Sequence, residues 1–332
     1  MANILRDQIN LKQTSSHTYT ISTHPEWAAG LALHGGCVAA AIHHAASTHL
    51  STTLAAQNQP DILTLHIEFL RACDVRENGS VVTVTDLKLG LGTSTIQLVL
   101  SQSGKTKVLA LATSTNFDKP VGPSAPTAWS FHPPPKPAPD FAKVLAHQPD
   151  ENWIPARILG DVLPFTHRIL YLNPREGFKF DGVCDAWNTA NGEPMDATFL
   201  AFMTDIIPSM SDTLLRNGGL YDAHRRQAQA MQWDQEHPGV PVKLVNTLKE
   251  AMEGTFNNFT VTLDIEFKRR LPKEGVRWVF ERTATRMLED GRMDVDVTIC
   301  DEMMAILCLS RQVILVLDAK RRFGGKKPQS TL

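Results

Sequence analysis

The chain has 332 residues, of which 42% are hydrophobic and 20% are charged. This composition supports a packed core of roughly two domains and excludes wholesale disorder. With 33 basic and 35 acidic residues the net charge is −2, which argues against a nucleic-acid binder or a membrane-surface binder.

The ends of the chain and its cysteines indicate the cellular compartment in which we expect the protein. No apolar run approaches the roughly 20 residues needed to cross a bilayer, and the N-terminal MANILRDQIN has no apolar signal core. The five cysteines are odd in number and scattered, which is typical of reduced thiols and not of a disulfide framework or a zinc site. We therefore expect a cytoplasmic protein. The alternative is a peroxisomal one, because Ser330-Thr331-Leu332 is similar to Ser-Lys-Leu, although it lacks the central basic residue.

The first half predicts one helix followed by an antiparallel meander. A glycine-rich loop at 26–36 precedes the small, helix-tolerant stretch CVAAAIHHAASTH at 37–49. Residues 62–70 then alternate between apolar and polar side chains, which is typical of a half-buried strand. Similar runs follow at about 80–89, 93–102 and 106–116, separated by glycine-containing breakers.

A proline-rich stretch divides the chain. Eight prolines lie between Pro120 and Pro139, and such a stretch cannot hold a regular ladder. We expect an N-terminal domain at 1–120, a linker at 121–150, a C-terminal domain at 151–322 and a basic tail at 323–332. An SH3-type ligand motif at PPPKP is the alternative reading of the linker.

The second half predicts the same order of elements. Strands are expected at about 165–173 and 178–188, then a helix from Met195 to Met210 with Asp196 as its N-cap. Further strands are expected at about 259–269, 276–288, 292–301 and 304–318. The intervening segment at about 211–258 is predicted to be an insertion near the pocket mouth, either a mobile lid or a helical surface decoration.

An internal match links the two halves. Leu63–Arg71 reads LTLHIEFLR and Val261–Arg269 reads VTLDIEFKR, so six of nine positions agree at an offset of 198 residues. Both segments begin a three-strand run after a helix. We therefore predict a duplicated α+β unit, each copy a long helix wrapped by an antiparallel sheet, with Phe69 and Phe267 at equivalent core positions.

Several common catalytic signatures are missing. The sequence contains no GxSxG, no GxxxxGK[ST] and no HExxH. His43, His44 and His49 diverge around a helix and are not expected to hold one metal ion. The basic tail (Lys320, Arg321, Arg322, Lys326 and Lys327) reads as a solvated end, with phosphate contact as the alternative.

A long helix with a curled antiparallel sheet, occurring twice, resembles the double hotdog fold. The stretch Trp27–Ala40, QNQPDILTLHIEFLR at 57–71 and WSFHPPP at 129–135 resemble fungal thioesterase-like proteins, as do Asp196–Pro208 and Phe259–Arg269. The resemblance covers about residues 10–320. These proteins are similar to type II acyl-CoA thioesterases, which implies hydrolysis of acyl thioesters without a metal or an organic cofactor.

The resemblance implies a catalytic set of one aspartate, one threonine and one glutamine. They fall on Asp205 in FMTDIIP, Thr260 in FTVTLDIEFKRR and Gln312 in LCLSRQVIL, although a one-residue slip would put Arg311 in the glutamine's place. A thioester is already activated, so a held and deprotonated water suffices, with the carboxylate as base. Threonine and glutamine side chains can orient that water, and partial burial would raise the pKa of Asp205.

The first half departs from this set. Ile62 corresponds to Thr260 by the repeat offset, and a less secure helix alignment puts His44 opposite Asp205. We therefore expect a degenerate equivalent site in the first half. His34, Gly35 and Gly36 at its helix start are expected to bind substrate, because paired glycines allow a ligand to approach the backbone.

The leading hypothesis is an acyl-thioester hydrolase acting on acyl-CoA or on a carrier-bound acyl chain. A pathway-specific hydrolase or cyclase of polyketide-type natural products, in secondary metabolism, is the alternative within enzymes. A non-catalytic acyl-binding protein is the rival from another class. No nucleic acid and no membrane are expected as partners, and an acyl carrier domain and a homo-oligomer stay open.

Overall fold

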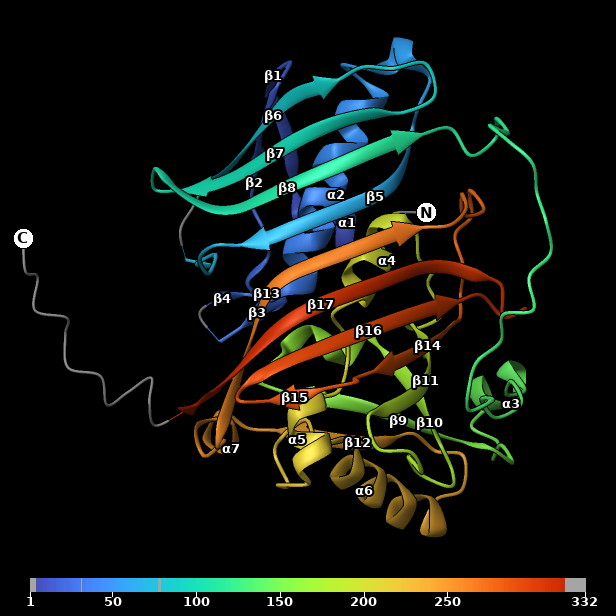
Figure 1. The fold of residues 1–332 in the computed structure, drawn as a ribbon. Helices are drawn as coiled ribbons and strands as arrows, with labels where there is room; N and C mark the ends of the chain where they lie inside the picture. The colour runs from blue at the N-terminus through green and yellow to red at the C-terminus, as the bar shows by residue number, and fades with distance from the viewer. Residues whose placement is uncertain (1–3, 31, 77–78, 320–332) are drawn as a thin grey trace, which may run out of the picture.

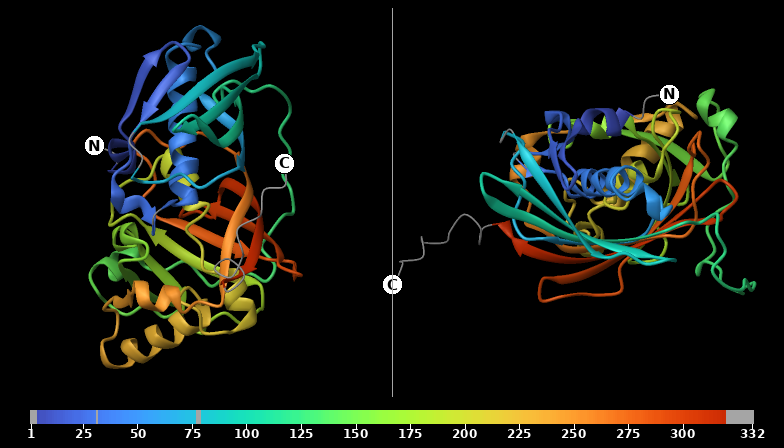
Figure 2. Two further views of the ribbon diagram at one scale, coloured as in Figure 1. Left: turned by 90° about the vertical axis from the view of Figure 1, so that its left-hand side faces the viewer. Right: turned by 90° about the horizontal axis from the view of Figure 1, so that it is seen from above.

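A single large sheet runs through both halves of the chain. In a computed structural model we describe residues 4–30, 32–76 and 79–319; the predicted basic tail and the C-terminal tripeptide lie outside them. The 15-stranded sheet has the order β1-β2-β6-β7-β8-β5-β13-β17-β16-β14-β11-β10-β9-β12, with β15 paired to β16 (Figure 1). Figure 2 shows the sheet curving around helix α2.

In the first half the four predicted strands are confirmed, each within one residue at either end. The strong alternation of buried and exposed side chains explains the agreement, because a half-buried strand is recognised by that period. The elements are α1 (Ile4–Ile9), β1 (Leu11–Ser15), β2 (Thr18–Ile21), η1 (Pro25–Trp27), β3 (Ala28–Ala29), β4 (Ala32–Leu33), α2 (Gly35–Ser51), η2 (Ala55–Gln57), β5 (Asp61–Phe69), β6 (Ser80–Lys88), β7 (Ser94–Gln102) and β8 (Lys105–Thr115).

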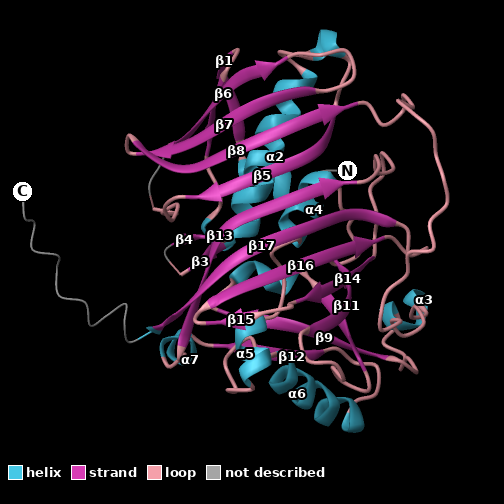
Figure 3. Cartoon of the chain, in the orientation of Figure 1, coloured by secondary structure: helices cyan, strands magenta, loops and turns pink. Residues whose placement is uncertain are grey.

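The second half contains more elements than its sequence predicts (Figure 3). Pro155 argues against a strand in sequence, yet β9 pairs with β10 on one side and β12 on the other. The elements are α3 (Phe141–Leu145), β9 (Trp153–Gly160), η3 (Pro164–Arg168), β10 (Leu170–Pro174), β11 (Val183–Thr189), α4 (Ala197–Met203), α5 (Met210–Leu215), α6 (Ala223–Glu236), β12 (Val242–Asn246), α7 (Leu248–Met252), β13 (Phe256–Phe267), β14 (Val279–Ala284), β15 (Leu288–Glu289), β16 (Arg292–Cys300) and β17 (Ile306–Asp318).

The predicted helix from Met195 to Met210 is wrong in length. Asp196 does cap it, accepting a hydrogen bond from the Phe199 amide at 2.9 Å, but α4 has only 7 residues against 17 in α2. Pro208 lacks an amide hydrogen and disfavours helical geometry in the residue before it. The α-helix ends already at Met203, where the amides of Asp205 and Ile206 donate to carbonyls three residues back instead of four, and Asp205 lies just beyond its end.

The duplication is confirmed by the pairing of β5 with β13. These antiparallel strands meet with His66 opposite Asp264, two residues that are themselves 198 apart, and the His66 ring lies 2.5 Å from the Asp264 carboxylate. The pairing is therefore symmetric about that point. The strand order β6-β7-β8-β5 on one side is mirrored by β14-β16-β17-β13 on the other, and Phe69 and Phe267 each end their strand.

Irregularities in the sheet also repeat. The register shifts between Ile62 and Thr64 in β5 and between Thr260 and Thr262 in β13. Both shifts fall at the same place under the 198-residue offset. A bulge re-aims the side chains beside it, so each half has the same departure from regular strand geometry at the position that Thr260 occupies.

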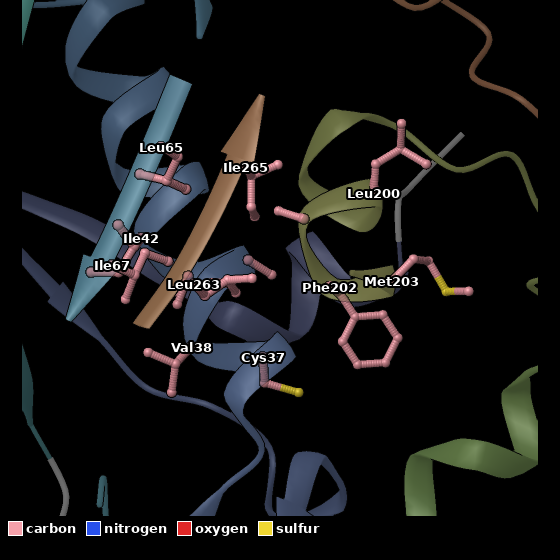
Figure 4. Packing of buried hydrophobic residues seen from close by; sticks show 14 of the residues in the cluster. Cys37, Val38, Ile42, Leu65, Ile67, Leu200, Phe202, Met203, Leu263 and Ile265 are labelled. Atoms are coloured by element: carbon pink, nitrogen blue, oxygen red, sulfur yellow. The ribbon is translucent and has the colours of Figure 1, made fainter. Parts of the chain in front are cut away.

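The core lies between the two central helices and the concave face of the sheet. Small residues of α2, including Ala39 and Ala40, are fully buried and permit close approach to α4 and the sheet. Figure 4 shows Leu65 and Ile67 of β5 beside Leu263 and Ile265 of β13 in this core. Both halves therefore contribute to this core, and the two central helices pack together within it.

The proline-rich linker is docked against the sheet. Arg282 of β14 donates a hydrogen bond to the Pro133 carbonyl at 2.7 Å, and its guanidinium lies 4.6 Å from the centre of the Phe131 ring. The Phe131 ring packs on Phe280. The linker therefore covers the outer face of the C-terminal half before α3 begins.

The insertion after α4 forms a packed layer. β12 extends the sheet by pairing in parallel with β9, and Ala230 of α6 is buried against both strands. All five cysteines are buried, and none of them forms a disulfide bond in the described ranges. In the part of the chain that the structure describes, no helix has the length and apolar character to span a membrane.

Candidate active site

Asp205 lies beneath the start of helix α2. The break after α4 leaves its side chain 14% exposed, and the amide hydrogen of Gly36 interacts with its carboxylate. A Cβ added to Gly35 would stand 2.6 Å from Asp205 Oδ2, and one added to Gly36 would stand 2.5 Å from the Phe202 carbonyl. A side chain at Gly36 would therefore clash with the backbone of α4, and one at Gly35 would displace the Asp205 carboxylate.

His34 links the helix start to the same carboxylate. As the N-cap of α2 its Nδ1 accepts a hydrogen bond from the Gly36 amide at 3.2 Å, and Nδ1 lies 3.6 Å from Asp205 Oδ2. Burial lowers the pKa of His34, with the Asp205 charge acting in the opposite direction. The ring is therefore neutral near pH 7, with its hydrogen on Nε2.

The environment of Asp205 favours a proton acceptor. Burial raises the pKa of Asp205, while His34, the Gly36 amide and the Gln312 side chain act to lower it. A carboxylate with a raised pKa accepts a proton more readily than an exposed one. The N-terminal end of α2 adds the positive end of a 17-residue helix dipole beside it.

Gln312 and Thr260 form a hydrogen-bonded chain behind Asp205. Gln312 is fully buried, donates through Nε2 to the Thr204 carbonyl at 2.9 Å, and accepts from the Thr260 hydroxyl at 3.2 Å. Arg311, by contrast, is exposed and pairs with Asp296 on the outer side of the sheet. The structure thus brings together Asp205, Thr260 and Gln312, and puts Gln312 rather than Arg311 on the inner face.

The positions of the first half that correspond to Thr260 and Gln312 carry apolar side chains. Gln312 pairs with Leu263 as Ala112 pairs with Leu65, so Ala112 takes the glutamine's place and Ile62 takes that of Thr260. These two side chains offer no hydrogen-bonding group, as the sequence predicts for a degenerate site.

The helix alignment in the first half needs a correction. Counting nine residues from each N-cap, His34 and Asp196, puts His43 opposite Asp205, one residue before the predicted His44. The His43 ring lies 3.0 Å from the Thr198 hydroxyl of α4, and burial lowers the pKa of His43 to about 3. An uncharged ring therefore stands where the other half has a carboxylate.

A pocket opens beside Asp205 and His34. Most of its lining residues belong to the C-terminal half, and His34 at the start of α2 is the contribution of the first half. Thr260 and Gln312 do not line it, so they act behind the carboxylate. Its apolar walls come from β9, β11, the first residue of α6 and connecting segments that include the chain after α4 (Ile158, Leu163, Ile169, Phe178, Ala186, Ile206, Ile207, Pro208 and Ala223).

The pocket also has polar walls that sequence reasoning missed. Glu281 of β14 is buried, and burial raises its pKa well above the ordinary value. Tyr171, Tyr221 and Arg226 line another part of the pocket. No local sequence pattern indicates this group, because its members come from separate elements. The insertion supplies Tyr221 and Arg226, so it forms a wall of the pocket.

A separate histidine cluster lies at the other end of α2. His49 Nε2 lies 3.0 Å from Asp86 Oδ1 and His17 Nε2 lies 3.1 Å from Asp86 Oδ2. Their ligand atoms all lie within 4.8 Å of one another, a spacing that a metal ion could use. His43 and His44 are not part of this group.

The fold and site together define the class of a double hotdog protein. Two family models match the chain, the acyl-CoA thioesterase N-terminal domain at residues 23–115 and the acyl-CoA thioesterase C-terminal domain at residues 113–316. The chain therefore belongs to the acyl-CoA thioesterase family and is a thioesterase-like hydrolase.

Individual relatives agree with this assignment. The chain is 29% identical to the thioesterase-like protein TwmA of Talaromyces wortmannii, over 96% of this chain and 93% of that protein. The fold is shared with a putative thioesterase II from Thermobifida fusca YX (TM-score 0.64, 16% identity, covering 94% and 97% of the two chains). A hot dog fold protein of Alicyclobacillus acidocaldarius also matches (TM-score 0.69, 14% identity, 96% and 99%).

Proposed function

We propose that this chain hydrolyses acyl thioesters, with Asp205 as the general base. The observation that carries the proposal is the position of Asp205: it lines the pocket, lies against the start of α2 and has a pKa raised by burial. A carboxylate in such a place can accept a proton from a water molecule that attacks the thioester carbonyl.

The proposed reaction needs no group beyond the chain and water. Asp205 takes one proton as the water oxygen bonds to the carbonyl carbon, and the tetrahedral intermediate then expels the thiolate. The C–S bond breaks, and the proton passes from Asp205 to the thiolate. In this proposal the positive end of the α2 dipole stabilises the developing oxyanion, and His34, which lines the pocket, binds substrate through its Nε2 hydrogen.

Thr260 and Gln312 act as positioning residues in this scheme. The Thr260 hydroxyl donates to Gln312 Oε1, which leaves the amide nitrogen of Gln312 for the Thr204 carbonyl and the Asp205 carboxylate. In this scheme the two side chains orient the carboxylate, which differs from the expectation that they orient the water directly. The chain of hydrogen bonds fixes the carboxylate, and fixed geometry lowers the barrier to the attack.

The identity of the acyl group and its carrier is part of the proposal. Either CoA or an acyl carrier domain would present the same thioester to Asp205. A hydrolase or cyclase of polyketide-type compounds is the second candidate, and the polar side chains Tyr171, Arg226 and Glu281 in the pocket favour it, because oxygen-bearing acyl groups can use them. A non-catalytic acyl-binding protein would bind the same ligands without turnover.

We propose the cytoplasm as the location, since five buried cysteines without a disulfide bond among the described residues suit reduced thiols. The test of function is a panel of acyl-CoA substrates of different lengths, with detection of the free thiol. Release of thiol by the wild-type chain, and its loss on Asp205→Asn, is expected. Binding without release of thiol would favour the acyl-binding alternative.

A further inference from the structure

Arg226 is a buried cation within the same pocket. It lies on α6, is 8% exposed and lines the pocket. Its Nε donates weakly to the Leu220 carbonyl at 3.4 Å, while Nη2 is buried and has no hydrogen-bond partner among the described residues. A buried guanidinium nitrogen without an acceptor is costly, which points to a ligand atom at this place.

Two tyrosines share this environment. The Arg226 guanidinium lies 4.4 Å from the centre of the Tyr221 ring. The hydroxyls of Tyr171 and Tyr221 are both buried and make no hydrogen bond of ordinary geometry in the described ranges, although the Asn246 side chain interacts with the Tyr221 hydroxyl and acts to lower its pKa. Burial raises the pKa of each phenol to about 12, so both remain neutral and can donate. Three donors from β10, α6 and the loop before α6 therefore lie in one pocket without an acceptor.

The acidic side chains near Arg226 are engaged elsewhere. Asp212 and Asp222 act on Arg226 electrostatically, but Asp222 accepts from the His224 amide at 2.8 Å as the N-cap of α6. Asp212 accepts a hydrogen bond from the side-chain amide of Asn217 at 2.9 Å. Neither forms an ion pair with Arg226. The strongest acceptor that could complete this group is an anionic oxygen brought by a ligand.

We propose that Arg226, Tyr171 and Tyr221 bind a carboxylate carried on the acyl group, away from the thioester. This rests on the proposed function, because it assumes that the thioester meets Asp205 in the same pocket. The substrate class is then an acyl thioester with a second acidic group, such as the monothioester of a dicarboxylic acid. Apolar walls between the two polar ends would contact the connecting carbon chain.

Binding can be tested without turnover. Alkyl-CoA thioethers cannot be hydrolysed, so carboxypentyl-CoA and hexyl-CoA thioethers form a pair that differs in the terminal group. Matched pairs from propyl to octyl cover the distance between the two ends. We expect calorimetry to show that the carboxylate member binds tighter by about tenfold or more at one chain length, the size expected for hydrogen bonds to a charged partner.

Variants assign the preference to these residues. Arg226→Gln and Tyr171→Phe should each reduce the preference for the carboxylate, and Arg226→Lys should restore part of it. Arg225→Gln is the matched control, because Arg225 pairs with Glu250 outside the pocket. If Arg226→Gln does not fold, as judged by thermal unfolding, Tyr171→Phe still tests the site by removal of a single hydroxyl.

Two results would overturn the inference. One is equal binding of both members at every chain length. The other is an equal loss of affinity for both members in Arg226→Gln, which would assign Arg226 to the CoA phosphates or to structure. Failure of the proposed function is seen separately, as no thiol release from any thioester while the thioether preference persists.

Discussion

The side-chain amide of Gln312 donates to the backbone carbonyl of Thr204 at 2.9 Å, across 108 residues of sequence. This bond joins strand β17 to the end of α4, one residue before Asp205. Because Pro208 prevents the helix from continuing, the backbone there lacks regular helical bonds, and Gln312 supplies one of the replacements. The candidate base is thus positioned by the sheet rather than by its own helix.

Removal of the Thr260 hydroxyl should weaken this arrangement. In Thr260→Val the Gln312 side chain loses its hydrogen-bond donor and can rotate, so we expect kcat to fall by about tenfold, the size of one hydrogen bond, with KM little changed. Thr262→Val is the matched control, since alternation along the strand puts Thr262 on the other face from buried Leu263. Equal losses in the two variants would contradict the assigned role of Thr260.

Gly35 should not accept a side chain without a change in the position of Asp205. A Cβ in Gly35→Ala would lie 2.6 Å from Asp205 Oδ2 and displace the carboxylate, and a displacement of about 1 Å costs roughly 100-fold in rate. Gly92→Ala is the control, because nothing lies within 4 Å of its added Cβ. Kinetics with an accepted acyl-CoA and thermal unfolding would be measured for both. Unchanged turnover in Gly35→Ala would show that Asp205 is not held where we place it.

The pH profile should follow the ionisation of Asp205. Burial raises its pKa above the ordinary value of 3.8, and the base works only when deprotonated. The kcat/KM of the wild-type chain should therefore rise with pH through a single ionisation displaced upward from 3.8. The residual activity of Asp205→Asn should lack this acid limb. An identical limb in the variant would assign it to another group.

Stability should also depend on pH through Glu281. Burial raises its pKa well above the ordinary value of 4.5, against a weaker effect of the Thr283 hydroxyl. At a pH between the Glu281 pKa of the unfolded chain and that of the folded chain, the folded chain holds one more proton. The free energy of unfolding therefore falls as the pH rises from the unfolded-state pKa toward the folded-state pKa. Glu281→Gln keeps the shape of the neutral acid and removes this loss. Its melting temperature, relative to wild type, should rise as the pH increases above the ordinary value of 4.5, whereas parallel curves would contradict the buried neutral acid.

Local sequence pattern accounts for much of the fold and for the residues near Asp205. Strands β5 to β8 alternate clearly, and the match between 63–71 and 261–269 leads to the paired strands at the centre of the sheet. The sequence predicts Asp196 correctly as the N-cap of α4. It misplaces the end of the helix, because the effect of Pro208 outweighs the apolar pattern that continues beyond Met203.

The rest depends on contacts between distant elements. Strand β9 carries Pro155, and its pairing with β12 is set by the insertion packing, which no local pattern shows. The polar pocket walls bring Tyr171 from β10 beside Arg226 from α6 and Glu281 from β14. Each residue is ordinary in its own segment, so its role emerges only from the folded arrangement.

The most direct test of the account compares wild type with Asp205→Asn in hydrolysis of an acyl-CoA panel, while affinity for an alkyl-CoA thioether is measured in parallel. The substitution keeps the size of the side chain and removes its ability to take a proton. We predict a fall in kcat of about 10²–10⁴, the range for a general base, with thioether affinity retained. Full hydrolytic activity in Asp205→Asn would contradict the central claim that this carboxylate activates the attacking water.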